Sequence, residues 1–247
     1  NNVLWWITNV SDRYMVAYLL GNDANGLYAV AYKVPSIVVL VSGIFMDAWQ
    51  ISAITEQKAR DRFYSKVVNI YSMLLFVMAS GAILLTKVIP LILFDESYYA
   101  AWRYIPLPVV STVFTCLVNF LGSIYMVEKK SVRSLMTATL SAVINVGLNL
   151  WWIPLYQVNG AAAATLICYL VVFIVRLADT RKYIRIKWHY FRLILNTVVL
   201  LTQCYCVLFE VPYWILYEVA LFVLMLLVNG RGLILGIKGI VRKNKAA

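Results

Sequence analysis

Charged residues are scarce in this sequence. Only 13% of its 247 residues are Asp, Glu, Lys or Arg, and 63% are hydrophobic, whereas an ordinary soluble domain carries roughly 25% charged residues. The composition therefore excludes a water-soluble globular domain. A helix that crosses a bilayer needs about 20 apolar residues, so the length is sufficient for about eight spans with short loops. The sequence predicts an all-α, polytopic membrane protein.

The residue types that carry most enzymatic chemistry are also rare. His189 is the one histidine, and it lies between Trp188 and Tyr190 in a basic stretch, as residues at a membrane interface do. The sequence has no Gly-rich phosphate loop, no carboxylates at metal-binding spacing, and no serine or cysteine nucleophile near a histidine. The four cysteines lie in apolar stretches, which predicts buried thiols. We expect no enzyme, no metal site and no cofactor.

Apolar runs divide the chain into eight predicted spans. Turn residues separate them, notably at 21–26 and 154–160, and Pro212 marks the restart of a helix. The spans are predicted at 3–20, 27–54, 66–89, 104–127, 133–153, 159–179, 190–209 and 211–229.

The basic residues concentrate on one side of this topology. Of 22 Lys and Arg, 18 follow spans two, four, six and eight, two lie in loops on the opposite side, and Arg13 and Lys33 lie in or near the membrane. Cytoplasmic loops carry an excess of Lys and Arg, so both ends of the chain are predicted in the cytoplasm. The net charge of +11 then reflects topology, and nucleic acid is not expected as a partner.

Two segments have the composition of helices that lie on the membrane surface. Residues 94–104 mix charged with aromatic residues, which predicts an external interfacial helix. Residues 230–247 alternate aliphatic and basic residues, which predicts a cytoplasmic helix against anionic membrane lipids.

Ionisable residues within the first two spans are the strongest candidates for a functional site. Asp12 and Arg13 lie midway along the first span, where each costs roughly 2.5 to 3.5 kcal/mol on insertion scales. Asn9 lies on the same helical side as Asp12, and Lys33 and Asp47 lie on one seam of the second span. Such charges mark substrate or ion pathways. The alternative is an interhelical charge network that fixes packing.

Weakly polar faces on two later spans allow two interpretations. Small and weakly polar residues at these spacings favour close packing of helices, although the asparagines are equally able to donate to sugar hydroxyls in a cavity. The faces comprise Thr112, Cys116, Asn119 and Ser123, and Thr137, Ser141, Asn145 and Asn149.

Five segments in order along the chain resemble one family of transporters. They are SDRYMVAYLLG (11–21), GLYAVAYKVPS (26–36), DAWQISAITE (47–56), YYAAWRYIPL (98–107) and INVGLNLWWIPLYQVNGAAAATLICYLVVFIVR (144–176). Together they resemble the polysaccharide-repeat flippases, the Wzx-like branch of the multidrug/oligosaccharidyl-lipid/polysaccharide superfamily. Members have two six-helix lobes, and this chain looks like spans seven to fourteen. The resemblance implies a C-terminal lobe at 1–180, two peripheral helices at 181–229, a basic tail at 230–247, and an N-terminal lobe as a missing partner.

The resemblance also implies an activity. It implies translocation of undecaprenyl-pyrophosphate-linked oligosaccharide from the cytoplasmic to the outer leaflet of a bacterial inner (plasma) membrane, for O-antigen, capsule or exopolysaccharide, alongside other polysaccharide assembly proteins. Arg13, Lys33 and Asn9 would then contact pyrophosphate or glycan. Asp12 or Asp47 would couple transport to a proton or sodium gradient.

Three alternatives remain. A multidrug exporter of the same fold would have an acidic and aromatic cavity, which Arg13 and Lys33 disfavour. A noncatalytic scaffold or inactive half-carrier is the second, and a glycan polymerase or transferase is the third. The four intramembrane charges sum to zero, so these residues alone do not make the cationic cavity that an anionic substrate favours.

Overall fold

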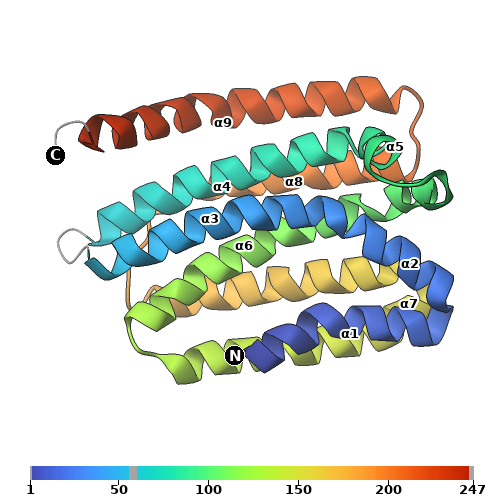
Figure 1. Ribbon diagram of the computed structural model, residues 1–247. Helices are drawn as coiled ribbons and strands as arrows, with labels where there is room; N and C mark the ends of the chain where they lie inside the picture. Colours follow the sequence, from blue (N-terminus) through green and yellow to red (C-terminus); the bar gives the residue numbers. More distant parts are fainter. Residues whose placement is uncertain (1, 56–59, 245–247) are drawn as a thin grey trace.

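The protein is all-helical in a computed structural model that describes the backbone of residues 2–55 and 60–244 and the side chains of 11–50 and 60–236. Its elements, in order, are α1 (Asn2–Leu20), α2 (Asn22–Ala31), α3 (Lys33–Thr55), α4 (Arg60–Leu84), α5 (Val88–Leu93), the 3-10 helix η1 (Glu96–Tyr104), α6 (Pro106–Val127), α7 (Ser131–Thr180), α8 (Tyr190–Leu208) and α9 (Trp214–Asn244). The long helices run side by side as one bundle (Figure 1).

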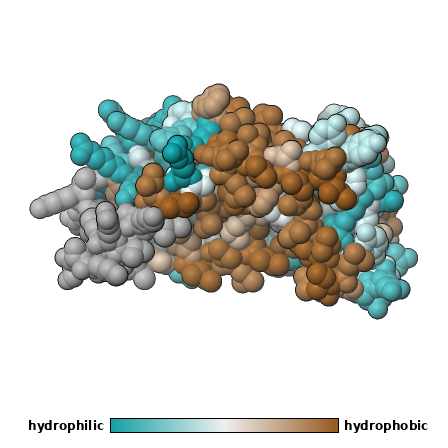
Figure 2. Space-filling model, turned by 90° about the horizontal axis from the view of Figure 1, so that it is seen from above, coloured by the Kyte–Doolittle hydropathy of each residue, from teal (hydrophilic) through white to brown (hydrophobic). Residues whose placement is uncertain are grey.

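Six helices in the described residues are long and apolar enough to cross a membrane. They are α2 with α3, α4, α6, α7, α8 and α9. The face over α9 shows a hydrophobic belt between more hydrophilic ends (Figure 2). These helices make the chain a multi-pass membrane protein, while the predicted number of about eight spans is not confirmed, because α1 is not among the six and α7 contains two predicted spans.

Helix α7 folds back on itself. Gln157 has φ 55° and ψ −137° within its 50 residues, and a Cβ on Gly160 would stand 2.2 Å from the carbonyl oxygen of Trp152. Only glycine permits that approach, since any other residue carries a Cβ there. Asn145 donates to Thr165 across the two arms at 3.1 Å. The predicted spans 133–153 and 159–179 are therefore antiparallel arms within one element (Figure 1).

The second predicted span is broken near its start. Helix α2 ends at Ala31 and α3 begins at Lys33, so the break lies just before Pro35. Proline has no N–H, so Pro35 cannot donate to the carbonyl of Ala31. The helical stretch also begins at Asn22 rather than at residue 27, directly after Gly21 with φ 91°.

The predicted interfacial segment 94–104 forms η1. Asp95 caps it, because its side chain accepts from the backbone N–H of Ser97 at 3.0 Å. The hydroxyl of Ser97 also donates to Asp95, at 2.7 Å. The two hydrogen bonds from Ser97 lower the pKa of Asp95. Trp102 is buried rather than free at the surface, so η1 is packed into the bundle.

Helices α8 and α9 pack on α4 through buried polar contacts. Ser80 donates to Gln203 at 2.7 Å, and Gln203 donates to Glu218 at 2.8 Å. The amides of Asn196 and Asn229 bond reciprocally, at 3.0 and 3.1 Å. Helix α9 continues without a break through residue 230, so the predicted boundary between span and tail is not a helix end.

The two ends of the bundle differ in charge. The loops at 128–130 and 181–189 lie at the same end as the last turn of α3 and the last turns of α9 (Figure 1). We call this the basic end, because Lys129, Lys130, Arg181, Lys182, Arg185 and Lys187 lie in these loops. This is the arrangement that the partition of basic residues predicts.

Candidate functional site: a polar cavity with two arginines

A cavity of about 770 Å³ lies between α1, α3, α6 and both arms of α7. Serine and threonine hydroxyls, amides and phenols make up its polar wall. The polar lining residues are Arg13, Tyr32, Ser36, Ser42, Gln50, Ser111, Thr112, Thr115, Asn119, Ser123, Tyr125, Ser131, Ser134, Thr165, Tyr169 and Arg176. Two of these are cations, and within the described residues no carboxylate lines the cavity.

Arg13 projects from α1 toward the cavity. Its side chain is exposed, whereas the neighbouring Asp12 is buried at 3% exposure. Consecutive helix positions point in different directions, so α1 separates the two charges. No ion pair or hydrogen bond joins Arg13 to the described part of the chain. Its guanidinium is therefore available to a ligand.

Arg176 is the second cation of the wall. Its Nε donates to Thr137 at 3.0 Å, its Nη1 donates to the carbonyl of Val118 at 2.8 Å, and its guanidinium lies 5.7 Å from the ring centroid of Tyr125. Only 7% of the residue is exposed. Among the described residues, the guanidinium bonds through Nε and Nη1, and Arg176 lines the cavity.

The count of 18 basic residues in Sequence analysis includes Arg176 among those that follow the sixth predicted span, although that span is predicted to run to residue 179. The structure corrects this assignment, because α7 continues to Thr180 and places Arg176 one turn before its end. A basic residue so near a predicted boundary has the same sequence signature in a loop as in a last turn. Gly122, on the facing helix α6, leaves room for the guanidinium.

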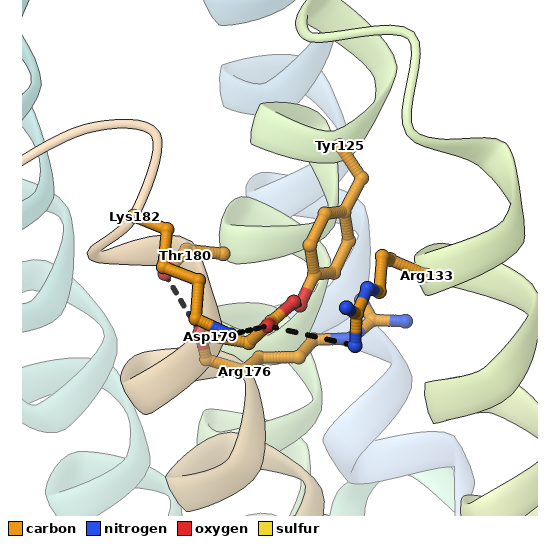
Figure 3. Close-up of polar contacts among 6 residues, drawn as sticks. All are labelled: Tyr125, Arg133, Arg176, Asp179, Thr180 and Lys182. Carbon is orange, nitrogen blue, oxygen red and sulfur yellow. Dashed lines mark hydrogen bonds and ion pairs between the residues drawn. The ribbon is translucent and has the colours of Figure 1, made fainter.

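Asp179 is an acidic residue at the basic end, close to Arg176 in sequence. Asp179 accepts from the hydroxyl of Tyr125 at 2.9 Å and pairs with Lys182 at 3.1 Å and with Arg133 at 3.9 Å. Figure 3 shows the Tyr125 hydroxyl pointing toward Asp179, with the side chain of Arg176 nearby. Asp179 does not line the cavity. Its charge is compensated by Arg133 and Lys182, which lie outside the cavity.

Asp12 is the centre of a buried hydrogen-bond network between α1 and α7. Its Oδ1 accepts from Asn149 at 2.5 Å, and its Oδ2 accepts from Thr165 at 2.5 Å and from Tyr28 at 3.4 Å. Asn145 bonds to Thr165 and to Asn149. No lysine or arginine in the described residues pairs with this carboxyl group.

The chemistry of this network suits a small cation or a proton. The oxygen atoms of a carboxylate, two amides and a hydroxyl are hard ligands, and the Oδ1 of Asn149 is buried without a hydrogen-bond partner. An uncompensated carboxylate is costly within a membrane. Neutralisation of Asp12, by a proton or a monovalent cation, therefore lowers the free energy of the buried state.

The other predicted site residues lie elsewhere. Lys33 is exposed, 5.5 Å from the ring centroid of Phe94, and Asp47 is exposed; neither lines the cavity. The side chain of Asn9 falls outside the described residues. Among the described side chains, no ion pair joins any two of Asp12, Arg13, Lys33 and Asp47.

The two weakly polar faces separate in the structure. Thr112, Cys116, Asn119 and Ser123 all line the cavity. Thr137, Ser141, Asn145 and Asn149 do not line the cavity and bond across the arms of α7 or to α1.

Comparison of the chain with family models, curated proteins and solved structures finds no match.

Proposed function

We propose that the chain is the substrate-binding half of a flippase for undecaprenyl-pyrophosphate-linked oligosaccharides, moving them from the cytoplasmic to the outer leaflet of a bacterial plasma membrane for surface polysaccharide synthesis. A six-helix partner lobe would complete the cavity. The arms of α7 would each cross the membrane, and with α1 they would give eight crossings and leave the basic end in the cytoplasm. The resemblance of the five segments motivates this proposal.

The composition of the cavity wall carries the proposal. The wall combines hydroxyl and amide groups with Arg13 and Arg176 and, in the described residues, contains no carboxylate. Hydroxyls and amides both donate to and accept from sugar hydroxyls, and guanidinium groups bind phosphate oxygens in bidentate fashion. The zero sum of the four predicted charges does not apply to the wall, since Asp12 is buried behind it and Asp47 lies outside it.

The same observation distinguishes the flippase from a multidrug exporter. A cavity for cationic drugs would place carboxylates where the drug binds, and the described wall carries cations instead. A phosphate anion would be stabilised by electrostatic attraction to both arginines.

Asp12 is the better candidate of the two predicted coupling residues. It is buried among oxygen ligands, whereas Asp47 is exposed. A proton or sodium ion that neutralises Asp12 would change the contacts between α1 and α7, and Arg13 lies on the same helix.

The experiment is an assay of lipid-linked oligosaccharide that reaches the outer leaflet, made with the chain and its partner lobe. Arg13→Lys keeps the charge and loses the bidentate fork, and Arg13→Gln loses both, so translocation should fall in the order native, Lys, Gln. A charge-assisted hydrogen bond contributes about 1.5 to 3 kcal/mol, so the glutamine variant should lose roughly ten- to a hundredfold. Asp47→Asn, outside the wall, is the control. Normal translocation by well-folded Arg13→Gln would refute the proposal.

A further inference from the structure

A second, smaller pocket lies at the basic end. It encloses about 370 Å³ between α4, α9 and the loop at 181–189. Its lining residues are Ser65, Lys66, Asn69, Ile70, Lys187, His189, Gly232, Leu235 and Gly236. Two lysines and a histidine thus face a pocket that, within the described residues, is lined by no carboxylate.

The loop is fixed on α4 by a repeating set of hydrogen bonds. The backbone N–H groups of residues 185, 187 and 189 donate to Asp61 Oδ1 (3.3 Å), Ser65 Oγ (2.8 Å) and Asn69 Oδ1 (3.2 Å) respectively. Asn69 also donates to the carbonyl of residue 187 at 2.9 Å. Four residues of helix rise about 6 Å, and two residues of extended chain rise about 6.6 Å, so the two repeats match.

This attachment sets which side chains face outward. Ile184, Ile186 and Trp188 are buried, and the intervening Arg185, Lys187 and His189 are exposed. The loop therefore holds the side chains of Arg185, Lys187 and His189 in a row, and Lys187 and His189 line the pocket.

Helix α9 supplies the floor of the pocket and its side toward lipid. A Cβ on Gly232 would stand 2.6 Å from Met73 Sδ, and one on Gly236 would stand 2.7 Å from Ile70 Cδ1. These glycines, one turn apart, let α9 approach α4 closely. Leu235 is 71% exposed between them, so the pocket opens where the apolar belt meets the basic end.

We propose that this pocket binds the phosphate of an anionic phospholipid, with the acyl chains along the apolar side of α9. Basic pockets between transmembrane helices on the cytoplasmic side bind lipid headgroups of this charge. The ammonium groups of Lys66 and Lys187 would contact the phosphate. A bound lipid would bridge α4, α9 and the loop, and would stabilise the packing of the peripheral helices. This proposal does not depend on the transport function.

The test is a titration of the purified protein in neutral detergent, with thermal unfolding as the readout. The added lipids are a phosphatidylglycerol and a phosphatidylcholine with identical acyl chains, and inorganic phosphate is a third arm. Phosphatidylglycerol should raise the unfolding temperature saturably, and the other two additions should not. Equal effects of the two lipids would overturn the proposal, and an equal effect of free phosphate would overturn its assignment to a lipid.

Matched double variants localise the effect. Lys66→Gln with Lys187→Gln removes two charges from the pocket, and Lys129→Gln with Lys130→Gln removes two from the same end outside it. A basic residue near an anionic surface contributes about 1 kcal/mol, or about fivefold in affinity, so the pocket variant should bind phosphatidylglycerol roughly 25-fold more weakly. The control should bind like the native protein. Equal weakening in both variants would show a diffuse surface charge and refute the site.

Discussion

The Nη1 atom of Arg176 lies 2.6 Å from the point where a Cβ of Gly122 would stand. That distance is too short for a non-bonded contact, so Gly122→Ala must displace the guanidinium from Val118 and Thr137. We expect the variant to lose about 1 to 3 kcal/mol of stability, since buried hydrogen bonds are broken, and to lose translocation.

Gly147→Ala is the matched control. A Cβ at Gly147 meets nothing within 4 Å, so alanine there should be neutral or stabilise α7 by up to about 1 kcal/mol through its helix propensity. Thermal unfolding and the translocation assay check both variants. A Gly122→Ala protein as stable and active as the control would contradict the tight placement of Arg176.

Asp12→Asn should remove the response to the coupling ion. The amide retains the shape of the carboxyl group and loses its charge, so the site for a proton or cation is lost. One acceptor oxygen becomes an NH2 donor, so at least one hydrogen bond that Asp12 accepts is also lost or reversed. We expect unfolding temperatures that no longer change with sodium concentration or with pH in the range where the native protein responds. Asp47→Asn should respond as the native protein does. An unchanged response in Asp12→Asn would exclude the carboxyl group from coupling.

Gln203 is the one hydrogen-bond partner that the described residues offer Glu218, which is fully buried. Gln203→Leu should therefore cost about 1 to 3 kcal/mol, because a buried polar group loses its partner. Replacing both residues by leucine should recover much of that loss. Denaturation in detergent measures the free energy of unfolding of the two single leucine variants and the double variant. If the losses of the single variants simply add in the double variant, the stability of Glu218 does not depend on Gln203.

Labelling of introduced cysteines tests the orientation. The four native cysteines are buried, so background labelling by a membrane-impermeant reagent should be low. A cysteine at Lys130 should react only from the cytoplasm, and one at Asp23 only from outside, because the basic end is predicted inside. External labelling at Lys130 would contradict the predicted orientation and place the basic end outside.

Lys87 joins the opposite end of the bundle to the peripheral helices. Its Nζ lies 2.7 Å from Glu210 and 4.1 and 4.5 Å from the ring centroids of Trp102 and Trp214. Lys87 lowers the pKa of Glu210 below its usual 4.5, so this contribution to stability is present above pH 4.5 and is lost as the pH falls through the lowered pKa.

The measurement is unfolding temperature against pH for the native protein and Glu210→Gln. The native protein should be the more stable at neutral pH, and the difference should disappear in acid. If the difference in unfolding temperature persists once Glu210 is protonated, the stabilisation comes from packing of the side chain rather than from the ion pair.

The membrane class and most helices were predictable from sequence because they depend on local composition. Long apolar runs, Pro35 and the turn around Asn159 act within a few residues of themselves. The break at Gln157 falls within the turn predicted at 154–160, whereas no local pattern marks the continuation of α9 beyond Gly230.

The candidate site was predictable only in part, for the same reason. Asp12 and Arg13 are conspicuous because charge is costly in an apolar span. The position of Arg176 depends on Gly122, 54 residues away in sequence, and the partners of Asp12 depend on the return of the second arm of α7. Long-range contacts of this kind become visible only in three dimensions.

Asp12 and Arg13 are separated by a single peptide bond on a rigid helix. A turn of α1 about its own axis that follows a change at Asp12 therefore also swings Arg13 across the cavity by the same angle. If Asp12 binds the ion and Arg13 binds the phosphate, rotation of α1 transmits the change at one residue directly to the other. Energy conversion would then need no relay through other side chains, and one residue inserted between the two positions would turn Arg13 by about 100° relative to Asp12, away from its place on the cavity wall.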